Sequence, residues 1–517
     1  MSRTRAVVLV WLLVSCWAGS LYLRAAVDPP PGRVFVGTFH WIDDFYNYAS
    51  YVQQSEDGAW AFRNKLLEPG RTRPELVNLE WWLIGKVSLG LGRRPFLAYR
   101  LLAIGFTLAL VAGVERWLAR AGLPASHRLP ALALVSLGGG LGGLLFEATD
   151  LPVRQCGDLT LALFPSLEIL ANPHFVAGTA LLVWALYALV AMPAPAGPLL
   201  GVGLGTALGL VRPYDLALLG LIRVLGVAAT EPPRRWPREL APLVGLAPVV
   251  AYDLWVFFGS DQFASFRSGG QFPPRLAFVP ALAPALLLAL LAGKAPVSDD
   301  GARRARVHLW VWVTVTLAIV VAQPGTFGLQ FLVGMGVPLL TLGAVGLAPF
   351  APRWTALAAV AFGTTAVVAT RVVLADDPHW FVPRTRMAAA AVLRDTCRPG
   401  DLVFAHPDVG LYAIGLSSCH AVLAHPAISD YEDRLAEASR FYDATTSAHE
   451  RASILDRRGV THLMLPGEAG PRPVAWLGPR TRFERVAGVG AGPAAITIYS
   501  RTPGRARPAP EGGKADR

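Results

Sequence analysis

Long apolar runs recur along roughly the first 375 residues of the 517-residue chain, with shorter polar stretches between them. A run of about 20 apolar residues can cross a bilayer as a helix. The first run, 6–26, follows a basic start but exceeds the apolar centre of a typical signal peptide, so we interpret it as an uncleaved first span. The pattern predicts eleven spans in all, the others at about 97–118, 129–148, 173–192, 198–211, 215–230, 240–258, 276–293, 307–322, 328–349 and 354–374.

Some of these segments are short for a span, and the stretch 198–230 could be divided differently. The apolar segment 76–91 holds Glu80 and Lys86, which favours a helix lying on the membrane surface with its charges reaching toward water. The glycine-rich stretch 136–143 falls inside a predicted span. There glycine more often permits close helix packing than phosphate binding.

After residue 376 the hydrophobic pattern changes to short segments of alternating type. Such alternation predicts a small α/β domain over 377–503. The last residues, 504–517, are rich in Pro, Gly and charge and are expected to be disordered. The expected fold is therefore an α-helical polytopic membrane domain, 1–376, followed by this α/β domain. Its predicted elements are strands at 401–405, 421–424 and 461–465, helices at 431–442 and 448–458, and a Pro-Asp-Val-Gly turn at 407–410.

Composition agrees with a membrane protein, because only 16% of the residues are charged and the mean hydropathy is +0.43. The net charge of +11 could indicate nucleic-acid binding, but the arginines cluster in the loops between apolar segments, so we reject that function. Basic residues favour cytoplasmic loops. With the N-terminus inside, thirteen basic residues fall in cytoplasmic loops and four in the short outer loops, which predicts a multi-pass membrane protein with the long loop 27–96 and the C-terminal domain on the outer side. The thirteen are Arg3, Arg5, Arg116, Arg120, Arg128, Arg234, Arg235, Arg238, Lys294, Arg303, Arg304, Arg306 and Arg353; the four are Arg154, Arg212, Arg267 and Arg275.

The long first outer loop contains two adjacent carboxylates, Asp43 and Asp44, followed by tyrosines. A helix that begins near Asp43 would place Asp44, Tyr48 and Tyr51 on one face. An acidic pair beside hydrogen-bonding aromatic residues suits proton abstraction or binding of a divalent cation. Asp is also favoured at helix starts for capping alone, so both interpretations stay open.

Other ionisable residues lie at the predicted outer ends of spans, where such groups are costly and therefore candidates for function. Arg212 could bind an anion such as phosphate through its planar guanidinium, or it could form a structural pair with Asp215 that braces a broken helix. Asn172-Pro-His174 could be a helix start or part of a site. Arg154 and Arg267 lie in neighbouring outer loops.

The sequence contains no Walker A motif, no zinc-binding pattern of His and Cys, and no Gly-x-Ser-x-Gly elbow. Cys397 and Cys419 both fall in the outer domain, where a disulfide could form, but the sequence leaves their pairing open. The histidines of that domain lack ligand spacing, and we interpret them as structural or surface residues. They are His406, His420, His425 and His462.

Several segments, taken in order and with this topology, resemble a known family. The chain resembles the multi-spanning C-superfamily glycosyltransferases that use lipid-linked sugars, of the protein O-mannosyltransferase and aminoarabinose-transferase type, and in particular a bacterial branch of them. The resemblance covers most of the chain. It rests on 41–54, 74–80, 211–215, 270–274, 330–338 and 424–432.

The resemblance implies transfer of a hexose or pentose, with inversion, from a polyprenyl-phosphate donor to an acceptor that could be a protein, a lipid or a polysaccharide. In the family, an acidic residue of the first outer loop acts as general base or coordinates a divalent cation. Asp43 or Asp44 takes that role here, although the adjacent pair departs from the Asp-x-Asp form, which leaves cation dependence open. From the predicted topology, Arg212 is the first candidate for the phosphate ligand. The remaining candidates for substrate binding are Arg154, Arg267, Asp215, His174 and Tyr48.

Two other classes of function stay in view. A transporter or flippase of lipid-linked glycans would also have many spans and discontinuous helices, but the two halves of this chain show no repeat. A non-catalytic membrane scaffold is the third possibility. The enzyme interpretation requires Asp43 or Asp44 to face a cavity that is shared with Arg212 and open to the outer leaflet, and it fails if both carboxylates point at bulk water.

Overall fold

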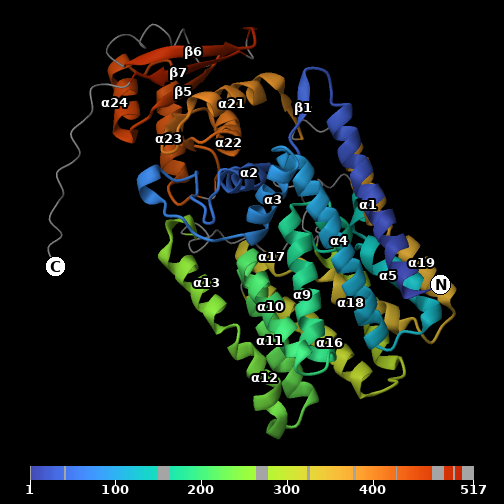
Figure 1. Ribbon diagram of the computed structural model, residues 1–517. Helices are drawn as coiled ribbons and strands as arrows, with labels where there is room; N and C mark the ends of the chain where they lie inside the picture. The colour runs from blue at the N-terminus through green and yellow to red at the C-terminus, as the bar shows by residue number, and fades with distance from the viewer. Residues whose placement is uncertain are drawn as a thin grey trace, which may run out of the picture.

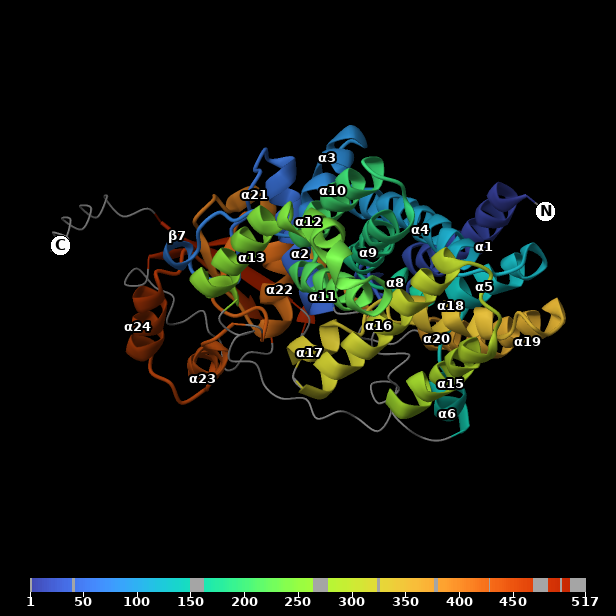
Figure 2. The same ribbon diagram turned by 90° about the horizontal axis from the view of Figure 1, so that it is seen from below.

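The computed structural model describes residues 2–39, 42–148, 162–263, 278–322, 326–375, 380–426, 428–467, 482–492 and 495–502. Long helices form a bundle, and an α/β domain built from the C-terminal part of the chain covers one end of it (Figure 1). Seen after a 90° turn, the domain again lies at one side of the molecule, with α1, α5 and α19 at the opposite side (Figure 2). The fold therefore has the two parts that the hydropathy pattern predicted.

Six helical segments in the described part of the chain are long and apolar enough to cross a membrane, and a pair bent by 56°, Pro233–Val244 with α13 (Ala247–Gly259), would make a seventh. Shorter apolar helices occupy other predicted spans, among them α10 (Ala196–Val211) and α18 (Gly336–Gly346). This is a multi-pass helical arrangement, and the count of eleven spans remains a prediction. The six are α1 (Arg3–Val27), α4 (Pro95–Arg120), α9 (Pro173–Ala191), α11 (Pro213–Thr230), α16 (Asp300–Ala322) and Pro352–Leu374, which comprises α19 (Pro352–Phe362) and α20 (Thr364–Leu374).

The predicted span 129–148 is divided into two short helices, α5 (Arg128–Leu137) and α6 (Gly142–Ala148). The glycine-rich stretch forms the break between them. A side chain at Gly139 would overlap Thr365 of α20, so glycine permits this close approach. The expected role of these glycines in close packing is confirmed. The expectation of one continuous helix is wrong, since the chain must turn to make that close approach.

The loop after α1 folds into two helices, α2 (Ile42–Glu56) and α3 (Leu79–Gly90), which lie between the bundle and the C-terminal domain (Figure 1). Strand β1 (Arg33–Phe35) pairs antiparallel with β2 (Phe381–Pro383) and so ties this loop to the chain that follows the last span. The helix predicted at 76–91 exists, but Glu80 is only 2% exposed. The expectation that this side chain reaches toward water is therefore wrong.

The C-terminal domain contains a five-stranded sheet in the order β4-β3-β5-β7-β6. Strand β3 is parallel to β4 and β5, and β7 is antiparallel to β5 and β6. The strands are β3 (Leu402–Phe404), β4 (His420–Ala421), β5 (His462–Pro466), β6 (Phe483–Val489) and β7 (Ile496–Arg501).

Four helices accompany this sheet: α21 (Arg384–Thr396), α22 (Pro407–Leu416), α23 (Tyr431–Tyr442) and α24 (Ala448–Arg458). The helices predicted at 431–442 and 448–458 are confirmed. The turn predicted at 407–410 is wrong, because Pro407 opens α22, where its missing N–H has no cost. The strand predicted at 421–424 is shorter and begins earlier, at His420. The tail 504–517 lies outside the described residues. Four further described helices are α8 (Pro165–Glu168), α15 (Phe278–Leu290), α17 (Thr326–Gln330) and α12 (Trp236–Val244).

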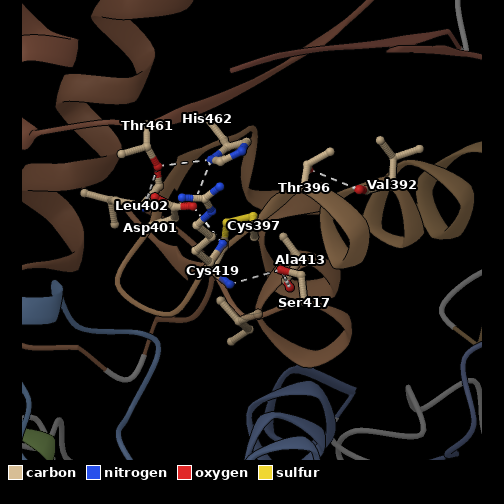
Figure 3. Close-up of a disulfide and its surroundings, with 12 residues drawn as sticks. Val392, Thr396, Cys397, Asp401, Leu402, Ala413, Ser417, Cys419, Thr461 and His462 are labelled. Atoms are coloured by element: carbon tan, nitrogen blue, oxygen red, sulfur yellow. Dashed lines mark hydrogen bonds and ion pairs between the residues drawn. A yellow bond between two sulfur atoms is a disulfide. The ribbon is translucent and has the colours of Figure 1, made fainter. Parts of the chain in front are cut away.

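The pairing of the two domain cysteines, which the sequence left open, is resolved by a disulfide. Cys397 caps the C-terminal end of α21 and Cys419 precedes β4, with 5.5 Å between their Cα atoms (Figure 3). His462 of β5 lies beside this bond (Figure 3). The disulfide ties α21 to the edge of the sheet.

Candidate functional site

The two carboxylates lie in the first turn of α2, and they have different surroundings. Asp43 is exposed. The side chain of Asp44 is 39% exposed, and its Oδ1 lies 3.2 Å from Nε2 of His425 in the C-terminal domain. His425 had been interpreted as a structural or surface residue, because nothing in the sequence connects it with the first loop. The structure thus gives Asp44 a cationic or hydrogen-bonding partner from a distant part of the chain.

The next turns of α2 carry the aromatic residues of the predicted face. The ring of Tyr48 stacks on Trp81 of α3 at 4.6 Å and meets the ring of His174 at 5.1 Å. Burial raises the pKa of Tyr48 well above its ordinary value, and the neighbouring charge of Asp44 adds to this effect. Tyr48 is therefore a neutral hydroxyl that lies between the acidic pair and the N-terminal end of α9.

Arg212 lies in the break between α10 and α11 and is only 1% exposed. Its Nε is 3.1 Å from Oδ2 of Asp215, and its Nη2 donates to the carbonyl oxygen of Gln330 at 3.1 Å. The guanidinium also lies over the rings of Tyr214 and Phe175, at 4.9 and 5.3 Å. The structural pair with Asp215, one of the two interpretations left open, is thus present. Among the described residues Arg212 Nη1 has no hydrogen-bond partner.

Two buried carboxyl groups near Arg212 were missed as site residues. Glu80 of α3 and Glu168 of α8 are both at most 2% exposed, and both lie within electrostatic range of the guanidinium. Burial raises the pKa of Glu80 well above its ordinary value and that of Glu168 to about 8. Both groups therefore carry a proton at neutral pH and can donate hydrogen bonds. Both could have been found from their apolar surroundings in the sequence, since Glu168 is the one Asp, Glu, Lys or Arg between Asp158 and Arg212.

The segment Asn172-Pro-His174 begins α9, as the helix-start interpretation expected. The side chain of Asn172 does not cap the helix. Its Oδ1 accepts a hydrogen bond from the Tyr99 hydroxyl at 2.8 Å. His174 is 5% exposed, and its Nδ1 has no hydrogen-bond partner in the described part of the chain. Arg100, also missed, lies over the ring of Tyr99 at 4.3 Å and adds a second cation at this end of the bundle.

Neither a protein-family model nor a curated protein matches the sequence. Solved structures match the fold. An arabinofuranosyltransferase AftD from mycobacteria has a TM-score of 0.59 at 15% identity over 98% of this chain. ArnT from Cupriavidus metallidurans has a TM-score of 0.56 at 14% identity, covering 97% of this chain and 100% of that one. This chain has the fold of the C-superfamily glycosyltransferases.

The archaeal oligosaccharyltransferase of Archaeoglobus fulgidus also matches this C-superfamily fold, with a TM-score of 0.52 at 11% identity over 88% of this chain and 69% of that one. The chain spans only 40% of the length of AftD, whereas it corresponds to the whole of ArnT. The resemblance noted from the sequence is therefore confirmed at the level of fold.

Within this C-superfamily fold, some expected site residues are not placed. Arg154 and Arg267 lie outside the described residues, so their predicted roles remain predictions. Among the described residues, the one group of three His, Cys, Asp or Glu ligand atoms close enough for a metal is formed by Cys397, Cys419 and His462. Its two sulfurs are bonded to each other, so it is not a metal centre in this state. The expectation that Asp43 and Asp44 bind a divalent cation stays a prediction.

Proposed function

We propose that this protein transfers a sugar from a polyprenyl-phosphate donor to an acceptor hydroxyl, with Asp44 as general base and Arg212 as a ligand of the donor phosphate. Solved structures of the same fold support the donor class. ArnT has been solved bound to undecaprenyl phosphate, and the archaeal oligosaccharyltransferase in complex with a dolichol-phosphate. Both likenesses are at or below 15% identity, so the argument for this chain depends on its own residues.

One observation carries the proposal: a single layer of polar and aromatic side chains connects Asp44 with Arg212. Tyr48 follows Asp44 by one helical turn and contacts His174, while its electrostatic neighbours include both Asp44 and Tyr214. The ring of Tyr214 lies 4.9 Å from the guanidinium of Arg212. A base and an anion-binding group at the two ends of one cluster are what sugar transfer from a phosphate requires.

The proposed step is a displacement at the anomeric carbon. The acceptor oxygen forms a bond to that carbon while its proton passes to the carboxylate of Asp44. The bond between the anomeric carbon and the phosphate oxygen breaks, and the electron pair leaves with the polyprenyl phosphate. The guanidinium of Arg212 stabilises the negative charge that grows on the leaving group.

Asp44 is a better candidate for the base than Asp43 because its position is fixed from two sides. The first turn of α2 orients its backbone, and His425 holds one carboxylate oxygen at 3.2 Å. The second oxygen is left for the acceptor hydroxyl, or for a divalent cation if the reaction uses one. Asp43 is the more exposed neighbour and serves as the natural control.

Arg212 is paired with Asp215 at 3.1 Å, so a donor phosphate must compete with that carboxylate for the guanidinium. The neighbouring acids favour such an exchange. In their protonated forms Glu80 and Glu168 can donate hydrogen bonds to phosphate or sugar oxygens without adding negative charge. The unpartnered Nη1 of Arg212 is a further donor for the phosphate.

We place the reaction on the outer face of the bacterial cytoplasmic membrane. The basic loop residues favour a cytoplasmic N-terminus, and this orientation puts α2, α3 and the C-terminal domain outside. The disulfide in that domain supports an oxidising compartment. A donor whose lipid chain stays in the bilayer suits a site at the end of the helical bundle. The sugar can be a hexose or a pentose, and the acceptor a protein, a lipid or a polysaccharide.

The test uses the full-length protein in lipid nanodiscs and in vesicles with a panel of polyprenyl-phosphate hexoses and pentoses. The expected result is loss of the sugar from at least one donor when cell-envelope extract supplies acceptors, and no loss with the double variant Asp43→Asn/Asp44→Asn. Movement of labelled donor between leaflets without sugar loss would identify a transporter instead. Tight donor binding with neither reaction would favour a scaffold.

A further inference from the structure

A second site candidate lies at the opposite end of α2 from the acidic pair. A half-open cavity of about 450 Å³ lies between the first loop, which contributes Gln54, Arg63 and Lys65, and the C-terminal domain, which contributes Ser418 and His420. Its volume falls within the range of small-molecule sites. From Asp44 to Gln54 the helix rises about 15 Å, so this cavity is separate from the proposed transfer site.

Positive charge dominates the cavity wall. Arg63 is cationic, Lys65 is partly charged at neutral pH, and the one carboxylate in the described lining, Asp57, is already paired with Arg93 at 3.2 Å. Nδ1 of His420 lies 2.7 Å from the carbonyl oxygen of Leu67, which assigns the ring proton to Nδ1. Burial lowers the pKa of His420, so the imidazole is mostly neutral and adds little charge to the cavity.

Lys65 is the most unusual member of this lining, because its side chain is buried with 4% exposure. Its ammonium donates to three neutral acceptors, Oε1 of Gln53 at 2.8 Å and the carbonyl oxygens of Ser417 at 2.7 Å and Ile414 at 3.4 Å. Burial lowers the pKa of Lys65 to about 7, and the nearby charge of Asp57 only partly offsets this effect. Because Asp57 is also paired with Arg93, an anion in the adjacent cavity would further favour the charged form of Lys65.

Arg63 is an exposed residue of the cavity lining whose backbone is fixed by hydrogen bonds. Its backbone N–H donates to Oε1 of Gln54 at 2.8 Å, and Nε2 of Gln54 donates back to the carbonyl oxygen of Arg63. One guanidinium nitrogen, Nη1, donates to the carbonyl oxygen of Thr72. The other guanidinium nitrogens can donate the pair of parallel hydrogen bonds with which arginine binds carboxylate and phosphate groups.

We propose that this cavity binds the oxyanion group, carboxylate or phosphate, of a small polar molecule of monosaccharide size, with Arg63 as its hydrogen-bonding ligand and Lys65 as a nearby positive charge. The molecule would contact both walls, so its binding holds the C-terminal domain against the first loop. Binding to the docked form alone stabilises that form by mass action. The site does not depend on the proposed sugar transfer, because the ligand binds without reacting.

The test is calorimetric titration of the full-length protein in nanodiscs with two probes, inorganic phosphate and glucuronate. Wild-type protein is expected to bind at least one of them, and the preferred probe distinguishes a phosphate-bearing from a carboxylate-bearing ligand. Arg63→Gln should weaken that binding by at least about tenfold. The matched control Arg440→Gln removes one exposed positive charge from α23, outside the cavity, and should leave the affinity unchanged.

A second variant separates this site from the proposed donor site. Ser418→Glu puts a carboxylate into the cavity, where it pairs with Lys65 and should abolish anion binding. Arg212→Lys alters the proposed donor site and should not change it. The proposal is overturned if neither probe binds to wild type, or if binding survives both Arg63→Gln and Ser418→Glu, or if Arg212→Lys alone removes it.

Discussion

Among the described residues, Arg212 and Arg434 are the arginines with at most 1% exposure, and their surroundings differ. Arg434 of α23 lies between two carboxylates, although its Nε and Nη2 form no hydrogen bond of good geometry among the described residues. Its Nη1 donates to the carbonyl oxygen of Val422, its Nε lies 3.1 Å from Asp430, and its Nη2 lies 3.9 Å from Glu68 of the first loop. Arg212 has a carbonyl and one carboxylate, and its Nη1 has no hydrogen-bond partner among the described residues.

The carboxyl groups around Arg434 and Arg212 differ as well. Around Arg434, Asp430 is also bonded to Arg71 at 2.8 Å and Glu68 to Arg458 at 2.7 Å, so positive and negative groups alternate across the junction of loop and domain. Around Arg212 the additional acids, Glu80 and Glu168, have raised pKa values and are neutral. An arginine between two carboxylates that are each shared with another arginine holds the fold together. An arginine with one carboxylate and neutral acids beside it has charge left for a ligand.

The largest expected effect concerns Asp44, the proposed general base, whose carboxylate contacts His425 of the C-terminal domain. Asp44→Asn removes the base and should lower kcat of sugar transfer by about 10² to 10⁴. The matched change Asp43→Asn keeps the base and its contact with His425, and should leave kcat within about threefold of wild type. Donor consumption at saturating donor measures both. Equal losses in the two variants would show that the pair acts as a helix cap or a joint cation site.

The next effect concerns Arg434. Arg434→Leu leaves Asp430 and Glu68 without their shared cation and should cost about 3 kcal/mol of stability. A lower melting temperature of the full-length protein would report this loss. The exposed Arg440→Gln on the same helix should change stability by no more than about 0.5 kcal/mol. An unchanged melting temperature for Arg434→Leu would contradict a structural role for this arginine.

The smallest expected effect is an opposite response of the two regions to acid. The pKa of Asp430 is lowered because Arg434 and Arg71 outweigh its burial. Its ion pairs therefore stabilise the fold above its unfolded pKa of about 3.9 and are lost as the pH falls through the lower folded pKa. The pKa of Glu80 is raised by burial, so this group costs stability above its unfolded pKa of about 4.3 and costs nothing below it.

Melting temperatures of Asp430→Asn and Glu80→Gln between pH 3 and pH 7 test this contrast. At pH 7 the Asp430→Asn protein should be less stable than wild type and the Glu80→Gln protein at least as stable. Both differences should shrink toward pH 3, where Glu80 is protonated in both states and Asp430 is protonated in the unfolded state. Differences of the same sign at pH 7 would contradict the assigned environments.

Local features of the sequence predicted much of this molecule. Apolar run length located the long helices, and the helices at 431–442 and 448–458 were confirmed. The break at Arg212 followed from Pro213, which begins a helix but cannot continue one. Helical spacing predicted that Asp44 and Tyr48 share one face of a helix. In the fold, the charge of Asp44 acts on the Tyr48 hydroxyl.

The remaining features depend on contacts between distant parts of the chain. Nothing near Asp44 indicates that His425 will meet it, and nothing near Lys65 indicates its contact with Ser417. The helix at Pro407 was mistaken for a turn because Pro-Asp-Val-Gly is typical of turns. Gly410 in that helix packs against the backbone of Leu423, a constraint that only the tertiary structure supplies.

The most direct test of the contrast between the two arginines is the affinity for polyprenyl phosphate, measured for wild type, Arg212→Lys and Arg434→Lys in nanodiscs. Both changes keep the positive charge and remove the planar fork of the guanidinium. A ligand role for Arg212 predicts binding weaker by at least about tenfold in Arg212→Lys and unchanged, per folded molecule, in Arg434→Lys. Equal affinity in all three proteins would contradict the assignment of Arg212 to the donor phosphate.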